Sequence, residues 1–349
     1  MRKIKVGVIG LGMGNYHLKR YAQCKGVEIL ALCDVSKSLL SEVSDKYDVP
    51  LTFTDYRKML QVEELEAVSI ATPNKFHAPM SIHALKAGKH VLCEKPMALN
   101  AKEAEKMLRE AEKNKRKFML HFNFRFSPQA RFIKRYVESG KLGDLYYVKT
   151  GWLRQMGAPM KRSFTDKKIS GGGPVIDLGV HRLDFALWLM GYPKVVSVVG
   201  ETRDKIAGPL ARKNKVYFDV EDIGVALIRL ENEALIFMEA SWATRTEWPE
   251  EMYTQLFGTK AGLEQRNVTG TYNFGVKLFE EKKGKIVVKK PAINYKDGNP
   301  QAHFVDCIRR DTEPMATGRQ GLEVMKILDA IYKSSRIKKE VGIAHEELL

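Results

Sequence analysis

The chain has 349 residues, of which 44% are apolar, 29% charged and 9% aromatic, a composition typical of globular proteins and long enough for about two domains. That composition excludes a disordered chain, a collagen and a small disulfide-rich fold, and no stretch reaches the roughly 18 uninterrupted apolar residues that a membrane helix needs. The net charge of +16 is spread along the chain without a basic tail or a base-reading motif, so we expect neither a nucleic-acid nor a membrane partner.

The first 122 residues alternate short apolar runs with helical patterns. Ser36 and Asn100 stand where two of the helices should begin, and both are good N-cap residues. Alternating strands and helices predict parallel pairing with right-handed crossovers, and therefore an α/β domain with a Rossmann-type doubly wound sheet that binds its ligand at the carboxyl ends of its strands. The expected strands are 4–9, 28–33, 67–71, 90–93 and 118–121, and the expected helices are 15–24, the segment after residue 36, a segment through 80–85, and 100–114.

The pattern changes after residue 122 to long stretches in which polar and apolar residues alternate. Such stretches predict antiparallel strands with one solvated face. We therefore divide the chain into 1–122, a dinucleotide-binding domain, and 123–349, an α/β domain with a large open, mostly antiparallel sheet. The expected strands are 145–153, 195–202, 222–230 and 234–241, the expected helices are 129–139, 181–190 and 321–335, and a lysine-rich run at 282–290 surrounds a glycine and predicts a hairpin turn.

The second sheet has an apolar face for which the sequence offers no helical cover. A stable monomer rarely exposes so large an apolar patch, so we expect a homodimer or homotetramer joined through that face. The last helix is free to return to the first domain, so the division between the domains need not be a single cut.

The cysteines form no CxxC pair and no zinc-type spacing. We therefore expect no metal site, and buried thiols in a reducing, cytoplasmic compartment. The N-terminus lacks the small-residue cleavage site of a secretion signal and runs directly into the first strand. The four cysteines are Cys24, Cys33, Cys93 and Cys307.

A glycine-rich turn, with Met13 inside it, follows the first strand and opens a helix. Gly10 allows the tight turn, and Gly12 lets the backbone approach a pyrophosphate, which the helix N-terminus then binds. In the usual fingerprint the third glycine stands at the position of Asn15, whereas here it is Gly14. We interpret the turn as a diphosphate site; the alternative is an ordinary tight turn between a strand and a helix.

Asp34 ends the second strand, 20 residues after Gly14, where an acid accepts hydrogen bonds from the hydroxyls of the adenosine ribose. A carboxylate there repels a 2′-phosphate, so the sequence favours NAD over NADP as cofactor. Lys37 lies close enough in sequence to weaken this preference. The alternative is an aspartate that merely caps the next helix.

Three further segments carry a resemblance to a known family. They are Ala71-Thr72-Pro73-Asn74-Lys75-Phe76-His77, then Glu94-Lys95-Pro96, then the run from Gly171 to His181. In order and spacing they closely resemble the glucose–fructose oxidoreductase/inositol dehydrogenase/MocA family, and the likeness extends to 303–306 and 314–318. The resemblance implies an NAD(P)-dependent oxidoreductase that acts on a CH–OH group of a sugar, inositol or related polyol, with a Rossmann domain and a second domain whose sheet commonly forms the oligomer contact.

The resemblance also implies roles for single residues. Lys95, Asp177 and His181 match the family's catalytic and substrate-binding positions. On the cofactor side it adds Thr72, Pro73, Asn74, His77, Glu94, Lys95 and Asn123. Arg125 matches a segment that borders the site, and Trp152, Arg154 and Arg162 are candidate substrate contacts because they lie near the glycine-rich segment in sequence. His17 and His83 have no such support.

The chemistry of an alcohol dehydrogenase fits the catalytic residue types. His181 can accept the hydroxyl proton near neutral pH, and Asp177, four residues earlier on a helix, can orient its ring. Lys95 can donate to the reacting oxygen. Taken singly, each would more often be structural, but together they predict one cleft in which all three converge. Two alternatives remain: a dinucleotide-binding sensor without chemistry, and a redox-neutral glycosidase or lyase of the same fold that retains NAD.

Overall fold

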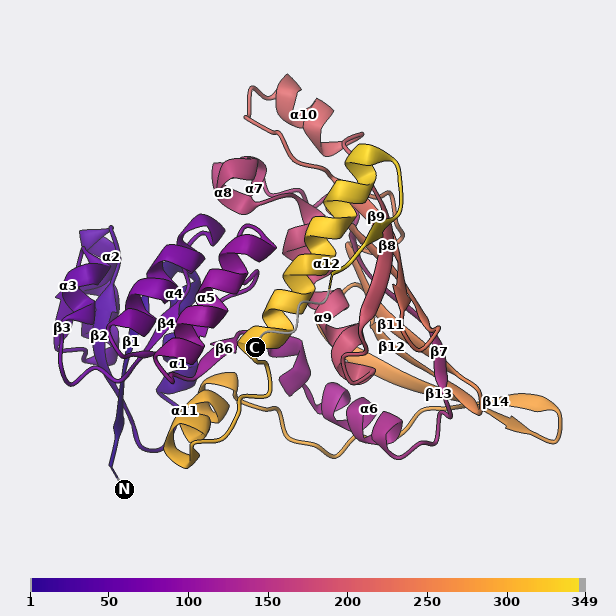
Figure 1. Cartoon of the computed structure of the whole chain (residues 1–349), viewed down its shortest axis with the longest axis horizontal. Coiled ribbons are helices and arrows are strands. Elements are labelled where there is room, and N and C mark those ends of the chain that lie inside the picture. Colours follow the sequence, from indigo (N-terminus) through magenta and orange to yellow (C-terminus); the bar gives the residue numbers. More distant parts are fainter. Residues whose placement is uncertain (1, 345–349) are drawn as a thin grey trace. The chain divides into compact units, whose positions relative to one another are not determined.

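The computed structural model describes residues 2–344, which form two compact units. The first unit holds residues up to 123 together with 299–325, and the second holds 124–298 together with the residues from 326 onward. We expected the boundary after residue 122, with the last helix free to return to the first domain; among the described residues the chain passes to the second unit after Asn123, returns to the first for one helix and the start of the last, and then continues in the second. Figure 1 shows the elements of both units in chain order. None of the described helices is long and apolar enough to cross a membrane.

The first unit contains a parallel sheet with the strand order β3-β2-β1-β4-β5-β6. This is the Rossmann order, and it confirms the predicted fold class. Its elements are β1 (Ile4–Ile9), α1 (Leu11–Tyr21), β2 (Val27–Cys33), α2 (Lys37–Tyr47), β3 (Leu51–Phe53), α3 (Tyr56–Leu60), β4 (Ala67–Ile70), a 3₁₀ turn (Asn74–Phe76), α4 (His77–Lys86), β5 (His90–Cys93), α5 (Ala101–Lys113), β6 (Phe118–Leu120) and α11 (Pro300–Arg310), with the start of α12 (Gly318–Ile337).

Helix starts in this unit follow the capping residues that the sequence offers. The Ser36 hydroxyl accepts the N–H of Leu39 at 3.3 Å and begins α2, and the Asn100 side chain accepts the N–H of Glu103 at 3.0 Å and begins α5. Ser36, and not Asp34, is therefore the N-cap of α2. The three-residue strand β3 and the helix α3 were not predicted, because both are shorter than the window over which a hydrophobic period can be read.

The second unit contains a sheet with the strand order β14-β13-β12-β11-β7-β10-β9-β8-β15, in which β7 and β10 pair in parallel and the other neighbours pair antiparallel. It confirms the predicted open, mostly antiparallel sheet. The elements are a 3₁₀ turn (Asn123–Phe126) at the boundary, α6 (Pro128–Glu138), β7 (Leu145–Arg154), α7 (Arg162–Thr165), α8 (Lys167–Ser170), a π-helical turn (Val175–Gly179), α9 (Val180–Leu189), β8 (Val195–Arg203), α10 (Ala207–Lys213), β9 (Ile223–Leu230), β10 (Leu235–Ser241), β11 (Glu250–Gly258), β12 (Ala261–Asn267), β13 (Phe274–Lys282), β14 (Lys285–Lys289), the end of α12, and β15 (Val341–Gly342).

One face of this sheet forms the core of the second unit. A row of directly paired aliphatic residues crosses seven strands, and α6, α9 and the π-helical turn pack on the sheet. All members of the row are at most 5% exposed: Val198, Ile228, Ile236, Val148, Leu256, Leu263 and Leu278. The opposite face carries Phe237, Leu227 and Val199 side by side across neighbouring strands, with Val199 43% exposed. The lysine-rich hairpin turn was predicted correctly, between β13 and β14 (Figure 1).

Candidate functional site

The glycine turn of the first unit is shaped to leave room for a ligand. Gly10 has φ 87°, and a Cβ added there would lie 2.7 Å from the Ala71 carbonyl oxygen. A Cβ on Gly14 would lie 2.7 Å from Val8 Cγ1, so this glycine allows α1 to pack closely on β1, the task of the third glycine in the usual fingerprint. A Cβ on Gly12 would meet nothing within 4 Å, which leaves open space beside the N-terminus of α1, where a diphosphate fits.

The residues within this turn point in different directions. Met13 is 59% exposed. The Asn15 side-chain oxygen accepts a hydrogen bond from the Tyr47 hydroxyl at 3.1 Å, so Asn15 ties α1 to α2. The Asn15 oxygen is thus engaged within the unit, whereas the Met13 side chain is open to solvent beside the turn.

Asp34 holds the turn and keeps acceptor capacity for a ligand. One of its carboxylate oxygens accepts the N–H of Leu11 at 2.8 Å, and the other accepts the N–H of Ser36 at 2.9 Å. Each oxygen has a further lone pair, and the side chain is half-buried at the carboxyl end of β2. The arrangement is compatible with ribose hydroxyls as additional donors.

His77, expected on the cofactor side, is fully buried and links two segments by their backbone. Its Nδ1 lies 2.7 Å from the Pro96 carbonyl oxygen and its Nε2 lies 2.8 Å from the Thr72 carbonyl oxygen. Burial lowers the pKa of His77, yet both partner atoms can only accept, so a neutral ring satisfies one of them at a time. His77 therefore does not face a ligand: it holds the 72–74 segment and the turn after β5 together.

Glu94, at the end of β5, is the centre of a buried hydrogen-bond cluster. One of its oxygens lies 2.8 Å from His17 Nε2 and 2.8 Å from His121 Nδ1, and the other accepts the N–H of Lys95 at 3.2 Å. Burial alone would raise the pKa of Glu94, but the interactions with His121 and His17 outweigh it and hold the pKa well below its usual range. Burial lowers the pKa of His17. Glu94 is therefore a buried carboxylate whose orientation is fixed by its neighbours.

These three side chains include the types of atom that bind transition metals, and their candidate ligand atoms lie within 4.8 Å of one another. Tetrahedral zinc ligands stand about 3.3 Å apart, since each lies roughly 2.0–2.1 Å from the ion. The nitrogen–oxygen distances of 2.8 Å are those of hydrogen bonds. We interpret the cluster as a hydrogen-bond network.

Lys95 and Asn123 lie after neighbouring strands of the same sheet. Lys95 is the one residue between 91 and 98 that is not buried, and a cis peptide bond joins it to Pro96. The side-chain oxygen of Asn123 is buried and has no hydrogen-bond partner among the described residues. The buried Asn123 oxygen and the open space at Gly12 both belong to the first unit and fit a bound dinucleotide. The segments that would hold it are Gly10–Gly14, Asp34, Thr72–Asn74, Glu94–Lys95 and Asn123.

In the second unit, Asp177 and His181 share the only accessible stripe of a buried helix. Every other residue from 172 to 189 is buried. Asp177 lies in a π-helical turn that precedes α9, where we expected regular helix, and π-turns are frequent at functional sites. The indole N–H of Trp242, a fully buried side chain, donates to Asp177 Oδ2 at 3.1 Å and so fixes the carboxylate.

The glycines before this turn serve packing. A Cβ on Gly173 would lie 2.1 Å from the Glu221 carbonyl oxygen, so the backbone here leaves no room for a side chain. The buried Glu221 carboxylate accepts the N–H groups of Gly173 and Val175 at 2.9 and 3.1 Å and the Tyr332 hydroxyl at 2.8 Å, and burial raises its pKa. Glu221 therefore fixes the backbone of the segment that carries Asp177.

Aromatic rings surround His181. Its ring centroid lies 5.1 Å from that of Phe124 and 5.6 Å from that of Trp152. The Trp152 indole donates to Glu250 at 2.9 Å, and Arg154 Nε donates to the other oxygen of Glu250 at 3.1 Å. Of the expected substrate contacts, Trp152 and Arg154 therefore belong to one cluster with His181, although Trp152 itself is only 4% exposed.

The two other arginines are placed differently. Arg125 is fully buried and binds Asp184 through two nitrogens, as well as the Tyr192 hydroxyl at 2.7 Å. It supports the packing of α9 and is not available to a substrate. Arg162 is on α7, where its exposed side chain pairs with Asp166 at 3.1 Å and lies over the Tyr217 ring, 5.5 Å from its centroid. Neither arginine is brought to the His181 cluster.

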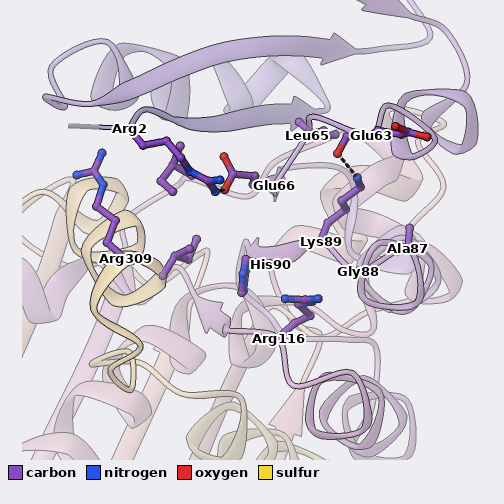
Figure 2. Close-up of a pocket in the computed structure, with 12 residues that line it drawn as sticks. Arg2, Glu63, Leu65, Glu66, Ala87, Gly88, Lys89, His90, Arg116 and Arg309 are labelled. Carbon is purple, nitrogen blue, oxygen red and sulfur yellow. Dashed lines mark hydrogen bonds and ion pairs between the residues drawn. The ribbon is translucent and has the colours of Figure 1, made fainter.

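Figure 2 shows a hollow of about 730 Å³ in the first unit, lined by residues at the amino ends of β1, β4 and β5. Lys89 donates to the Val62 carbonyl at 2.8 Å, and burial, with Arg116 and Lys117, lowers the pKa of His90 to about 4. Several of its lining residues lie in or just after the last turns of α4, α5 and α11, where cations are favourable. No predicted site residue lines the hollow, because those residues lie at the opposite ends of the strands.

Family profiles match both parts of the chain. Residues 4–122 match the profile of an oxidoreductase family with an NAD-binding Rossmann fold, and residues 130–264 match the GFO/IDH/MocA C-terminal domain. D-glucoside 3-dehydrogenase of Escherichia coli (strain K12) is 28% identical and the match covers 97% of both chains; myo-inositol 2-dehydrogenase of Thermotoga maritima is 24% identical, with 97% of this chain and 98% of the relative covered.

Solved structures show the same fold. A levoglucosan dehydrogenase complex with NADH and L-sorbose superimposes with a TM-score of 0.87 at 23% identity, covering 99% of this chain and 100% of the other. An aldose-aldose oxidoreductase from Caulobacter crescentus, complexed with glycerol, gives 0.84 at 25% identity, with 98% and 100% covered. The chain belongs to the glucose–fructose oxidoreductase/inositol dehydrogenase/MocA family of oxidoreductases, with an NAD(P)-binding Rossmann domain.

Proposed function

We propose that this protein is a dehydrogenase that transfers a hydride between a secondary alcohol of a sugar, inositol or related polyol and the nicotinamide of NAD. The observation that carries the proposal is the stripe of Asp177 and His181, the two accessible residues of an otherwise buried helix, because a buried helix seldom exposes two proton-handling groups on one face without a use for them. Full-length relatives that are named as sugar and inositol dehydrogenases support it.

In this proposal the residues divide the work of oxidising the alcohol. Bound NAD would supply the acceptor for the hydride that leaves the carbon. His181 accepts the hydroxyl proton, Asp177 orients the imidazole or the substrate, and Lys95 donates to the oxygen as it becomes a carbonyl. The products are a ketone, reduced cofactor and one proton. Trp242 keeps Asp177 in place, and Glu94, fixed by two histidines, sets the position of the backbone that carries Lys95.

The test is a substrate panel followed by variants. Inositols, aldoses and sugar acids are incubated with NAD and with NADP, and reduced cofactor is measured by absorbance. Loss of an acid–base group costs about 10²–10⁴-fold in rate, so His181→Ala and Lys95→Ala should each lower kcat by that order while NAD affinity stays nearly unchanged, and the double variant should lose less than the product of the two. His83→Ala, which removes a histidine paired with Tyr56, is the control. Wild-type turnover in Lys95→Ala would reject the mechanism and favour a sensor.

A redox-neutral reaction is the second candidate. It is favoured by the likeness to a protein described as an aldose-aldose oxidoreductase, a name that implies oxidation of one sugar and reduction of another. Such an enzyme would copurify with cofactor and convert two substrates without net NADH. Absorbance of the purified protein near the NADH band, followed during turnover, separates the two reactions.

A further inference from the structure

The second unit contains an ion pair that lies beside the His181 cluster. Arg154 and Glu250 are paired directly across β7 and β11, and their side chains are 21% and 19% exposed. They occupy the same sheet face as Trp152, which lies two residues from Arg154 along β7. Since Trp152 touches the His181 ring and Arg154 lies 5.5 Å from the Trp152 ring, Arg154 lies within the reach of a sugar bound at His181.

The Glu250 carboxylate accepts hydrogen bonds from three neighbouring side chains. One of its oxygens accepts the Trp152 indole N–H at 2.9 Å, and the other accepts Arg154 Nε at 3.1 Å and, more weakly, the Tyr272 hydroxyl at 3.4 Å. Tyr272 is 58% exposed, so the corner opens to solvent through its ring. The carboxylate therefore does two things: it neutralises Arg154, and it holds Trp152 against His181.

The charges around His181 in this unit cancel. Arg154 is offset by Glu250, and Asp177 contributes a negative charge. Arg182 contributes a positive one, but it is fully buried, with its guanidinium carbon 4.5 Å from the Phe124 ring centroid, so no substrate atom reaches it. Burial lowers the pKa of Arg182 to about 9, which leaves it charged at pH 7. His181 in its base form adds no charge, so these residues of the second unit sum to zero; Lys95 of the first unit, which the proposed function assigns to the reacting oxygen, adds one positive charge.

We propose that Glu250 is a specificity-determining residue that favours neutral sugars and polyols at this site, because it neutralises Arg154, the arginine beside Trp152 and His181 that could otherwise bind the carboxylate of a sugar acid. The inference rests on the proposed dehydrogenase function and deepens it. A sugar carboxylate brought to Arg154 has to displace Glu250 or share the guanidinium with it, and it also meets the charge of Asp177. A neutral hydroxyl instead finds acceptors in both carboxylates.

The experiment removes the charge of Glu250 and keeps its shape. Glu250→Gln retains an oxygen that can accept the Trp152 N–H, whereas Arg154 loses its counter-ion. We measure kcat/KM for glucose against glucuronate and for galactose against galacturonate, with saturating NAD. The matched control is Glu251→Gln, since Glu251 is the next residue, points to the other face of β11 and lies 3.9 Å from Arg266.

The wild type should prefer the neutral member of each pair. In Glu250→Gln the acid-to-neutral ratio should rise about tenfold, the lower end of what a charge-assisted hydrogen bond contributes. Glu251→Gln should change it by no more than about twofold, as for a screened surface charge. Arg154→Gln combined with Glu250→Gln should return the ratio to the wild-type value, which also shows that the effect does not come from misfolding.

Two results would overturn the inference: a wild-type preference for the acids, or a Glu250→Gln ratio that matches that of Glu251→Gln. If no sugar is oxidised at all, the proposed function fails, and the same ratios are then measured as binding constants by calorimetry with NADH present. Equal affinity of wild type and Glu250→Gln for glucuronate would reject the role of Glu250 independently of any turnover.

Discussion

We predict that the charge of Asp34 sets the preference for NAD over NADP, and the size of this preference can be worked out from electrostatics. Replacing it by Asn keeps the side chain's volume and one acceptor oxygen but removes the charge. A 2′-phosphate carries about −1.5 to −2 charges. At contact distances of ~4–5 Å and the high effective dielectric of a half-exposed site, repulsion from one carboxylate amounts to about 1–2 kcal/mol, or about 5–30-fold in affinity. Asp34→Asn should therefore raise the NADP-to-NAD affinity ratio by that factor.

The same variant should also loosen the glycine turn. The carboxylate accepts the N–H groups of Leu11 and Ser36; Asn can satisfy one of them and Ala neither, and each lost bond costs about 0.5–1.5 kcal/mol. The melting temperature should fall in the order wild type, Asp34→Asn, Asp34→Ala. Affinities are measured by calorimetry with both dinucleotides, and Asp45→Asn, on an exposed position of α2, controls for net charge.

Two results would contradict the role of Asp34 in choosing the cofactor. A wild-type protein that binds NADP more tightly than NAD would refute the reasoning and identify Lys37 as the phosphate contact. An unchanged ratio in Asp34→Asn, equal to that of Asp45→Asn, would reduce Asp34 to a structural residue of the turn.

Three further predictions concern other parts of the chain. Trp242→Phe removes the N–H donor of Asp177 and should lower kcat about tenfold with NAD affinity unchanged; an unaltered kcat would show that Asp177 needs no orientation. The pKa of His90 falls from 6.5 to about 4 on folding, so the unfolded chain binds the extra proton and the free energy of unfolding falls as the pH is lowered from about 6.5 to 4. In His90→Asn, which keeps an acceptor for the Lys117 N–H, this loss of unfolding free energy, measured by denaturant titration, should be about 1–2 kcal/mol smaller, a value reduced for partial exposure. Leu227→Asp on the outer sheet face should convert the expected dimer or tetramer to monomers in light scattering, and a wild-type monomer at micromolar concentration would reject that interface.

Much of the first unit could be predicted because its signals are local. Apolar runs, N-caps and the residues that follow each strand are contiguous in sequence, and the parallel topology then brings the strand ends to one edge. Asp177 and His181 were expected on one face from their spacing alone, and they do share the accessible stripe. The π-helical turn was missed because no local pattern distinguishes it from regular helix.

The partners of buried polar residues could not be predicted. Arg125 was expected at the substrate because its segment borders the site, yet it is paired with Asp184, 59 residues away in sequence. His17 lacked any supporting pattern and turned out to hold Glu94, 77 residues away. Burial and pairing at such separations depend on the tertiary fold, and the only local signal for His17 was its position on the inner side of the first helix after the glycine turn.

The two carbonyls that share the His77 ring imply a coupling between proton binding and cofactor binding. Both carbonyls already lie at hydrogen-bond distance from the ring, but a neutral imidazole donates to only one of them, and satisfying both requires a second proton. If a dinucleotide orders both segments, its binding should take up a fraction of a proton from solution. Calorimetric titrations in two buffers with different heats of ionisation would then give different apparent enthalpies, and in His77→Asn the two would coincide.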